Sequence, residues 1–586
     1  MRQWMVAAKK ADFYAIAEKF HVDPVVARII RNREVIGEKN IRIYLGGNLS
    51  DLSDPHQMKD MDRLVEILAQ KIRKQVHIRI IGDYDVDGVT SSHLFLTALR
   101  HVGAKVDVVI PHRIQDGYGL SLHLLQQAKE DGVDTILTCD NGIAAIDEIA
   151  WAKAQKMTVL VTDHHAVPFE EHEGRRTEKK SLADAVVNPH QQDCGYPYKE
   201  LCGAGVAWNV IRVLYENYDM DKREAEDLLD FVAMATVCDV MSLTGENRIL
   251  VKEGLKRIRH TKNIGLQALM QACNVQPENI SAYHFGYVLG PCVNATGRLD
   301  TARHALRLFE TGQETEAEEI ARDLVDLNQE RKELTLQGVE MAKKLCEEGG
   351  YENDPVLVLF LPDVHESIAG LIAGRIREMY NRPVFVLTRG EEGVKGSGRS
   401  TENYSMYENM CGCAELFTKF GGHPMAAGLS LPEENVEKFR RKINENCPLT
   451  VEEVCPDIHI DMAMPVGYAS TELVHQFALL EPFGKDNPSP LFADRNLSIS
   501  RMWVIGKNRN VLRMSVLSEY GQPVPVIFFG DVETLFAYFT EKFGQEEVEN
   551  ALHGRKNRIL FSMVYTAKVD FYQGNENLQL EMKYYR

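Results

Sequence analysis

The stretch DYDVDG at residues 83–88 carries three carboxylates at alternate positions and closes on a glycine. Alternation places Asp83 and Asp85 on the same side of an extended chain, where their charges repel each other unless a cation lies between them. A calcium-binding EF-hand loop begins in the same way, but it needs a glutamate at its twelfth position and a helix on either side. That position is Leu94, and the preceding VHIRIIG is typical of a buried strand. The stretch therefore predicts a cation site of another kind.

Other acids and two histidines end further apolar runs. They are Asp140 in TILTCDNG, Asp163, His164 and His165 in TVLVTDHH, and Asp239 in the helix-like EDLLDFVAMATVCDVM. Strand-like runs at 76–82, 105–111, 133–139, 157–162 and 182–188 alternate with helical patterns, which is typical of a parallel α/β sheet. Because ligand sites in open parallel sheets lie beyond the carboxyl ends of the strands, we expect these side chains to converge.

Four aspartates and one histidine make an oxygen-rich site that suits Mn²⁺ or Mg²⁺ better than zinc. If Asp140 bridges two ions, Asp83 and Asp85 can each contact a different one. Two ions about 3.5–4 Å apart can clamp the attacking and leaving oxygens of a phosphoryl group. His165 could then donate a hydrogen bond to a phosphate oxygen, so the residues predict metal-assisted phosphoester hydrolysis. A lone aspartate before a helix is more often its cap, and we interpret Asp87 in this way.

Composition limits the class of protein. A chain of 586 residues with 44% hydrophobic residues is expected to form three or four globular domains. The formal charge of -18 argues against a protein that coats nucleic acid, so a phosphate-rich substrate would need local basic groups and metals. Eleven cysteines without a CxxC pair are typical of reduced thiols, and no signal peptide or membrane span is expected, which predicts a cytoplasmic protein.

The organisation along the chain predicts a multidomain α/β protein. A long amphipathic helix from about Gln313 to Glu348 connects two α/β regions, and strand-like runs near the end suit a small β-barrel. The predicted regions are an N-terminal helical region (1–55), a parallel-sheet domain (56–260), a helical connector (261–350), a second α/β domain (351–449) and a β-barrel (450–586).

The motifs DYDVDG, CDNG, TDHH and ATVCDVM resemble, in order and spacing, those of the DHH phosphoesterase superfamily. VNATGRL, GSGRS and GGHPMAAG are similar to its associated DHHA1 domain. Length and the β-rich last region fit best with the RecJ family of single-strand-specific 5′ to 3′ exonucleases, whose last domain is an OB-fold. The resemblance extends over nearly the whole chain.

The resemblance implies roles for individual residues. The implied metal ligands are Asp83, Asp85, Asp140, His164 and Asp239. His165 and Asp140 are implied to be catalytic, with Asp163 orienting its neighbours. The residues implied to hold nucleic-acid phosphates are Arg113, Arg298, Ser397, Arg399 and His423. An interdomain salt bridge is the alternative role for Arg298 and Arg399. Several superfamily members have a histidine ligand where this chain has Ile81, so the first metal site would be weaker, filled only with substrate, or completed by water.

The last region supplies a candidate surface for a single strand. Arg501, Lys507, Arg509 and Arg513 lie near Trp503 in the sequence, and stacking beside a basic groove is how OB-folds hold single strands. Burial of Trp503 in the barrel core is an equally good interpretation.

The expected function is that of a cytoplasmic, metal-dependent exonuclease acting on single-stranded DNA in recombination and repair. The resemblance implies Mn²⁺ or Mg²⁺, two ions in number, as cofactor, and a RecQ-type helicase and a single-stranded-DNA-binding protein as partners. Two alternatives stay open. One is a DHH phosphodiesterase for short oligonucleotides, although such enzymes lack the last barrel. The other is a non-catalytic DNA-binding scaffold, which would have no reason to keep the acids.

Overall fold

The computed structural model describes residues 3–113, 116–117, 119–172, 175–390, 393–455, 457–506, 509–572 and 574–586. Contacts divide the chain into two compact units, Asn48–Pro456 and Gln3–Gly47 together with Asp457–Arg586. The predicted domain boundaries stay a prediction. Among the helices described, none is both long and apolar enough to cross a membrane.

The first unit begins with a five-stranded, all-parallel sheet in the order β3-β2-β4-β5-β8. Its strands are β2 (Ile78–Ile81), β3 (Val106–Val109), β4 (Thr135–Cys139), β5 (Thr158–Thr162) and β8 (Ala185–Val187). These strands lie within the five strand-like runs of the sequence, so this prediction is confirmed. The antiparallel pair β6 (Phe169–His172) and β7 (Arg175–Glu178) was not predicted.

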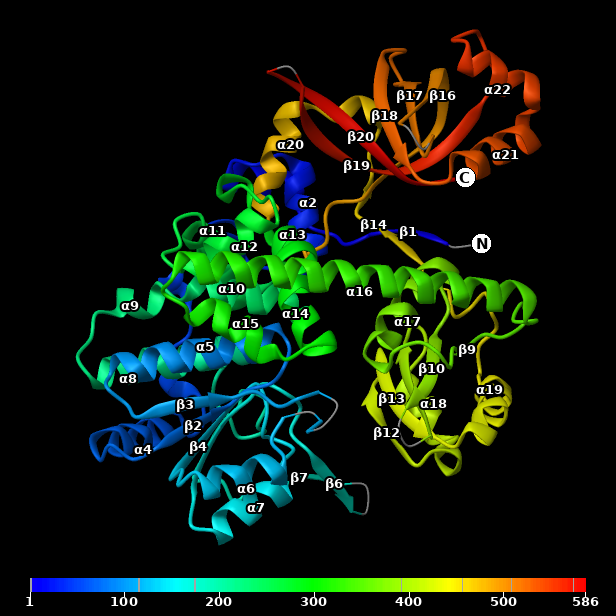
Figure 1. Cartoon of the computed structure of the whole chain (residues 1–586). Coiled ribbons are helices and arrows are strands. Elements are labelled where there is room, and N and C mark those ends of the chain that lie inside the picture. Colours follow the sequence, from blue (N-terminus) through cyan, green and yellow to red (C-terminus); the bar gives the residue numbers. More distant parts are fainter. Residues whose placement is uncertain are drawn as a thin grey trace. The chain divides into compact units, whose positions relative to one another are not determined.

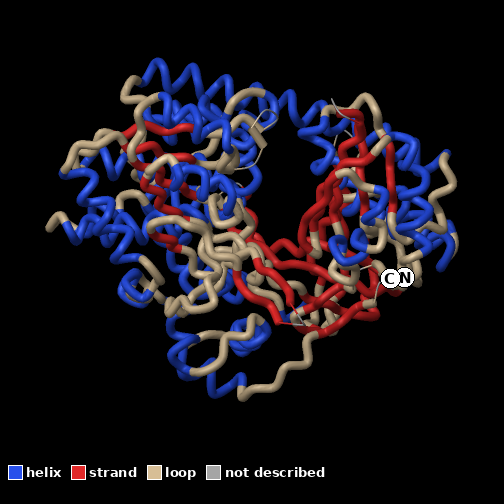
Figure 2. The backbone as a smooth tube through the Cα atoms, turned by 90° about the horizontal axis from the view of Figure 1, so that it is seen from below, coloured by secondary structure: helices blue, strands red, loops and turns tan. Residues whose placement is uncertain are grey.

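Helices cover both faces of this sheet. One core joins strand residues such as Ile80 and Leu137 to α4 (Met61–Arg73), α5 (Val86–His101) and α8 (Gly203–Asn217). A second core joins Ile136 and Val159, which point to the other face, to α6 (Leu122–Glu130) and α7 (Ile146–Ala154). Because both faces are buried, the strands read as nearly continuous apolar runs. The layers of helix, sheet and helix are visible in Figure 1, and Figure 2 shows the strands in red among the helices in blue.

A helical region continues the first core. Its elements are α9 (Lys222–Glu226), α10 (Leu229–Cys238), α11 (Gly245–Ile258), α12 (Ile264–Ala272), α13 (Ala282–His284), a π-helical turn (Phe285–Leu289), α14 (Gly290–Leu299) and α15 (Ala302–Glu310). The long helix α16 (Glu314–Glu348) follows as predicted and passes through Gly338 without a break. At that glycine α16 packs so closely on α17 (Glu366–Tyr380) that a Cβ would lie 2.3 Å from Ile372 Cδ1.

A second α/β region follows α16 (Figure 1). Its sheet has the order β12-β13-β11-β10-β9, in which only β9 and β10 are parallel. The strands are β9 (Leu357–Phe360), β10 (Val384–Gly390), β11 (Gly393–Arg399), β12 (Lys419–His423) and β13 (Ala426–Leu431), and the helices are α17 (Glu366–Tyr380), α18 (Met406–Cys411) and α19 (Val436–Glu445). Helices α16 and α17 cover one face of the sheet, and α18 and α19 cover the other.

The second unit is built on a closed β-barrel, as predicted. Strands pair in the order β15-β16-β17-β18-β20-β19, and β19 also pairs with β16, which closes the sheet. The strands are β15 (Met462–Ala463), β16 (Phe492–Ile505), β17 (Val511–Leu517), β18 (Pro523–Phe529), β19 (Leu560–Tyr572) and β20 (Asn575–Tyr585), and the helices are α20 (Thr471–Phe477), α21 (Val532–Phe543) and α22 (Gln545–Leu552).

The N-terminal segment belongs to the barrel unit. It contains β1 (Trp4–Val6), α1 (Phe13–Phe20), α2 (Pro24–Asn32) and α3 (Glu38–Gly46), and β1 pairs in parallel with β14 (Ile458–Ile460). Next to this pair, Arg33 forms a bidentate, buried ion pair with Asp461, with N–O distances of 2.6 and 3.1 Å.

Candidate metal centre and phosphate site

The first acidic motif lies where β2 turns into α5. Asp85 is the N-cap of α5, because its side chain accepts a hydrogen bond from the Gly88 amide at 3.0 Å. Gly88 has to be a glycine, since a Cβ there would lie 2.4 Å from the Asp83 carbonyl oxygen. The interpretation of Asp87 as the cap is therefore wrong: Asp85 holds that position, two residues earlier.

The Asp87 carboxylate points instead to the start of α8. It accepts hydrogen bonds from the amides of Gly203 at 2.6 Å and Ala204 at 2.8 Å. These are among the amides that a helix leaves unpaired at its N-terminus, where the helix dipole also favours negative charge. These hydrogen bonds hold the buried Asp87 carboxylate beside the other carboxylates. The alternation of Asp83, Asp85 and Asp87 in the sequence could have indicated this position.

Asp140 follows β4 in a conformation that is rare for a residue with a side chain. Its φ is 63°, and such strain is characteristic of functional sites. A Cβ on Gly203 would lie 2.6 Å from the Asp140 Cβ, so α8 approaches this residue as closely as a glycine permits. The adjacent Asn141 donates to the carbonyls of Ile81 at 3.0 Å and Cys139 at 2.9 Å, which ties the ends of β2 and β4 together.

The end of β5 supplies two histidines held by one carboxylate. Asp163 Oδ1 accepts hydrogen bonds from the amides of His164 (2.7 Å) and His165 (3.1 Å) and lies 2.8 Å from His165 Nδ1. Its other oxygen accepts from the Ile143 amide. Burial is the largest influence on Asp163 and opposes its ionisation, but the hydrogen bond and charge of His165, the charge of His164 and the Ile143 amide together lower the pKa of Asp163. Burial likewise opposes a charged His165, yet Asp163 raises the pKa of His165 to about 9.

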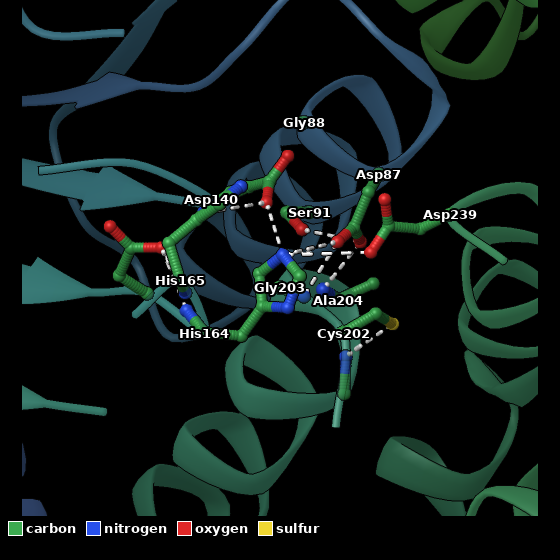
Figure 3. Close-up of polar contacts among 12 residues, drawn as sticks. Asp87, Gly88, Ser91, Asp140, His164, His165, Cys202, Gly203, Ala204 and Asp239 are labelled. Atoms are coloured by element: carbon green, nitrogen blue, oxygen red, sulfur yellow. Dashed lines mark hydrogen bonds and ion pairs between the residues drawn. The ribbon is translucent and has the colours of Figure 1, made fainter. Parts of the chain in front are cut away.

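These side chains converge as predicted. Figure 3 shows Asp87, Asp140 and Asp239 around His164. Three groups each have ligand atoms within 4.8 Å of one another: Asp83, Asp85 and Asp140; Asp140, His164 and His165; and Asp87, His164 and Asp239. His164 Nε2 lies at their centre, 3.1 Å from Asp140 Oδ1 and 3.6 Å from oxygens of Asp87 and Asp239. The structure thus brings all five predicted metal ligands together and adds Asp87.

The electrostatics of this cluster fit a pair of divalent cations. Burial and the neighbouring Asp85 raise the pKa of Asp83, and burial and Asp87 raise the pKa of Asp140, each well above its usual value. Asp83 Oδ2 and His164 Nε2 are buried without a hydrogen-bond partner among the residues described. Crowded carboxylates and unsatisfied ligand atoms of this kind are stabilised by cations. Ile81 is fully buried in a core beside this cluster and offers no ligand.

Three arginines form a second cluster next to the first. The pKa of Arg298 falls to about 9 because of burial and the charges of Arg113, Arg331 and Arg399, and burial and Arg113 also lower the pKa of Arg399. Arg298 Nη1 donates to the Ser367 carbonyl at 2.7 Å and Arg399 Nη1 to the Gly398 carbonyl at 2.8 Å. Across the described ranges no carboxylate is among the hydrogen-bond or ion-pair partners of these two guanidinium groups, so the salt-bridge alternative has no support. We call Arg113, Arg298 and Arg399 the arginine cluster.

Tyr84 connects the two clusters. It lies between Asp83 and Asp85 in the chain, and the Arg113 guanidinium lies 5.0 Å from the centre of its ring. Burial and the nearby Asp83 raise the pKa of Tyr84 to about 12, whereas Arg113 and Arg298 act in the opposite direction. Sequence reasoning did not select Tyr84, although its position between two predicted ligands could have indicated it.

A cleft of about 520 Å³ opens beside the arginine cluster. Its lining includes Tyr84 and Arg113 from the first α/β region and Ser367, Lys395, Ser397, Lys419 and Phe420 from the second. The structure therefore brings Ser397 to this cleft. It leaves His423 exposed at the end of β12, apart from the described residues that line the cleft.

Trp503 lies on the barrel wall rather than fully in its core. It pairs across the strands with Arg513, and the guanidinium groups of Arg501 and Arg513 lie 5.7 and 5.8 Å from its ring. The ring is half-buried, and Arg509 nearby is exposed. Lys507, the fourth predicted basic residue, lies outside the described residues.

Three family models match the chain. The DHH family N-terminal domain covers residues 77–236, the DHHA1 domain 353–447 and the RecJ OB domain 460–584. The metal-centre motifs lie in the first match or, for Asp239, just beyond it. Arg399 and Ser397 lie in the second match and Trp503 in the third.

Several curated proteins and solved structures are similar to the chain. Single-stranded-DNA-specific exonuclease RecJ of Haemophilus influenzae is 32% identical, with 96% of each chain covered. The protein of the same name in Bacillus subtilis is 33% identical over 87% of this chain, which spans only 63% of that longer protein. A crystal structure of RecJ in complex with Mn²⁺ from Thermus thermophilus superposes with a TM-score of 0.81 at 25% identity, covering 100% of this chain and 79% of that one.

Proposed function

This chain belongs to the RecJ family of DHH phosphoesterases, and on that premise we propose that it is a metal-dependent exonuclease that hydrolyses single-stranded DNA from the 5′ end. One observation carries the proposal: a metal-ligand cluster and a cluster of arginines without carboxylate partners among the described residues meet at Tyr84. The metal-ligand cluster binds cations, and the arginine cluster binds anions. A phosphodiester held between them therefore contacts metal ions on one side and guanidinium groups on the other.

The proposed metal ligands are Asp83, Asp85, Asp140, His164 and Asp239, with Asp87 beside them. The similar Thermus structure contains Mn²⁺, and the oxygen-rich donor set suits Mn²⁺ or Mg²⁺. When bound, two such ions activate a water molecule and neutralise charge on the phosphoryl oxygens.

Protein groups position the substrate. Asp163 holds the Nδ1 of His165 at 2.8 Å, and its carboxylate raises the pKa of His165, which favours the protonated imidazole. We assign to His165 Nε2 a hydrogen bond to a non-bridging phosphate oxygen, where a positive charge stabilises the developing negative charge.

The arginine cluster supports the proposed direction of hydrolysis. Guanidinium groups form paired hydrogen bonds with phosphate oxygens, and a terminal phosphate accepts more of them than an internal one. We assign the 5′-terminal phosphate to Arg113, Arg298 and Arg399. Ser397, which lines the cleft together with Arg113, donates its hydroxyl to the same phosphate. The strand then enters with its 5′ end first, and the bond nearest that end lies at the metal centre.

The remaining features support hydrolysis of a single strand inside the cell. Trp503, flanked by Arg501 and Arg513, is suited to stack on a base further along the strand. Eleven free cysteines are typical of the reducing cytoplasm. A RecQ-type helicase to supply the strand and a single-stranded-DNA-binding protein to protect it are the proposed partners.

The experiment that tests this function is a time course on a long 5′-phosphorylated strand labelled at either end. Mn²⁺ or Mg²⁺ should release mononucleotides at once from the 5′ label, and Asp140→Ala or a chelator should abolish release. Cleavage confined to oligomers of a few nucleotides would instead favour the short-substrate phosphodiesterase. Binding without any cleavage would favour the scaffold.

A further inference from the structure

An exposed pair of tyrosines stands beside the end of α10 that carries Asp239. The rings of Tyr283 and Tyr287 are stacked, with centroids 5.0 Å apart and planes inclined by 22°. The two residues expose 61% and 70% of their surface. Large aromatic rings that are both exposed and aligned contribute little to a core, so packing alone does not explain them.

Direct contacts fix this pair relative to the metal centre. The tyrosines lie two residues on either side of Phe285, which is about 3 Å along a helix axis. The Phe285 carbonyl accepts a hydrogen bond from Cys238 Sγ at 3.3 Å, and a Cβ on Gly290 would lie 2.2 Å from that sulfur. Asp239 is the next residue after Cys238. The π-helical turn Phe285–Leu289 contains Tyr287, and such turns are frequent at functional sites.

The helix that carries the tyrosines continues to the phosphate site. After the π-helical turn it becomes α14, where Asn294 accepts a hydrogen bond from the Val86 amide at 3.2 Å. Arg298 of the arginine cluster lies one turn further on. One helical segment therefore extends from the tyrosine pair past the first acidic motif to the proposed anchor of the terminal phosphate.

A second unusual residue adjoins the same place. Val240, next to Asp239, has a φ of 56° and exposes 63% of its surface. A β-branched residue rarely adopts this conformation, and glycine or asparagine is usual where a helix ends in it. The chain thus keeps an exposed apolar side chain beside a metal ligand at a cost in strain.

We propose that Tyr283 and Tyr287 form a stacking platform for bases of the strand whose 5′ end is being hydrolysed. The proposal rests on the proposed function and assigns the part of the site that holds bases rather than phosphates. Stacking suits any sequence because every base has a π-face. A base in a duplex has both faces covered by its neighbours, so a platform close to the metal centre also favours unpaired DNA.

The test compares three variants with the wild-type chain on a long 5′-phosphorylated oligothymidine with Mn²⁺. They are Tyr283→Ala with Tyr287→Ala, Tyr283→Phe with Tyr287→Phe, and Tyr14→Ala as a control for loss of an exposed tyrosine, since Tyr14 is 79% exposed on α1. The alanine pair should raise KM at least about tenfold, or about 1.4 kcal/mol of binding, and change kcat less than about twofold. The phenylalanine pair and the control should behave like wild type.

A spectroscopic measurement separates stacking from a structural role. In strands with 2-aminopurine at successive positions, binding to the metal-free protein should quench fluorescence at one or two positions. The alanine pair should lose this quenching and the phenylalanine pair should keep it. Unchanged KM and quenching in the alanine pair would overturn the platform, as would a loss of kcat that is equal on the long strand and on a 5′-phosphorylated dinucleotide. A wild-type chain that hydrolyses neither substrate would overturn the proposed function instead.

Discussion

At the scale of single residues, Asp163 determines the arrangement of both histidines. It is not in any of the ligand groups described, yet it accepts hydrogen bonds from two histidine amides and holds His165 Nδ1. Such partners of ligands set the orientation and basicity of the groups that they hold. The proposed roles of metal ligand and of orienting residue are thus divided between neighbouring positions in TDHH.

Asp163→Asn should therefore lower activity while leaving the ligands in place. An asparagine still accepts one hydrogen bond but carries no charge to keep His165 protonated. We expect a loss of about 10- to 100-fold in activity or metal affinity. Calorimetric titration with Mn²⁺, together with kcat on single-stranded DNA, measures both. Activity equal to wild type would show that Asp163 orients nothing that the reaction needs.

His93 provides a prediction about pH that does not involve the metal centre. His93 lies on α5 and is buried against Phe231 and Phe309. Burial lowers the pKa of His93 to about 3. Above pH 6.5 the histidine is neutral in both folded and unfolded chains. As pH falls from 6.5 toward 3, the unfolded chain takes up a proton that the folded chain refuses, so stability is lost at up to about 1.4 kcal/mol per pH unit.

His93→Phe should remove this part of the acid sensitivity. Urea unfolding of both proteins between pH 7 and pH 4 measures the free energy of unfolding against pH. The variant should lose less stability than the wild type over this interval. Parallel curves for the two proteins would mean that His93 takes up its proton equally in both states.

At the scale of elements, the start of α8 organises the metal centre. Its first amides bind Asp87, and Gly203 allows Asp140 to approach. The sequence predicted the strands that deliver the acids because buried parallel strands read as apolar runs. It did not identify which acid caps α5, because alternation alone does not tell Asp85 from Asp87. The side chain of Asp87 is positioned by a helix more than a hundred residues away.

Gly203→Ala, at the start of α8, should disrupt the metal centre. The new Cβ would lie 2.6 Å from the Asp140 Cβ, a backbone-fixed atom that cannot rotate away. We expect a loss of activity comparable to that of Asp140→Ala and a weaker response to Mn²⁺ in thermal denaturation. Gly205→Ala is the matched control on the same helix, since its Cβ would lie 3.4 Å from Leu201. Full activity in Gly203→Ala would contradict the close approach of α8.

At the scale of the whole molecule, the N-terminal segment joins the barrel unit across more than four hundred residues of sequence. The parallel pairing of β1 with β14 and the buried pair of Arg33 with Asp461 are long-range contacts. Sequence patterns report local periodicity, so they predicted helices at the N-terminus but not their partner. The same limit explains why a strand-based interpretation of the last region left out α21 and α22.

Arg33→Met should destabilise the barrel unit. Removing the guanidinium leaves Asp461 buried without its charge partner, which costs about 3–5 kcal/mol. Arg31→Met is the control, because Arg31 pairs with an exposed glutamate and such surface pairs contribute about 0–1 kcal/mol. Hydrogen exchange of amides in β16 and β20 reports on this unit within the full chain. Equal protection in the two variants would contradict the assignment of residues 3–47 to the barrel.

The most direct measurement identifies the first nucleotide released from a 5′-phosphorylated strand with different nucleotides at its two ends. Mass spectrometry of the products at the earliest times, with Mn²⁺ present, distinguishes the ends without a label. A site that holds the 5′ phosphate in the arginine cluster and the adjoining bond at the metal centre should release the 5′-terminal nucleotide first, as a 5′-monophosphate. Release of the 3′-terminal nucleotide first, or of internal oligomers, would contradict this arrangement.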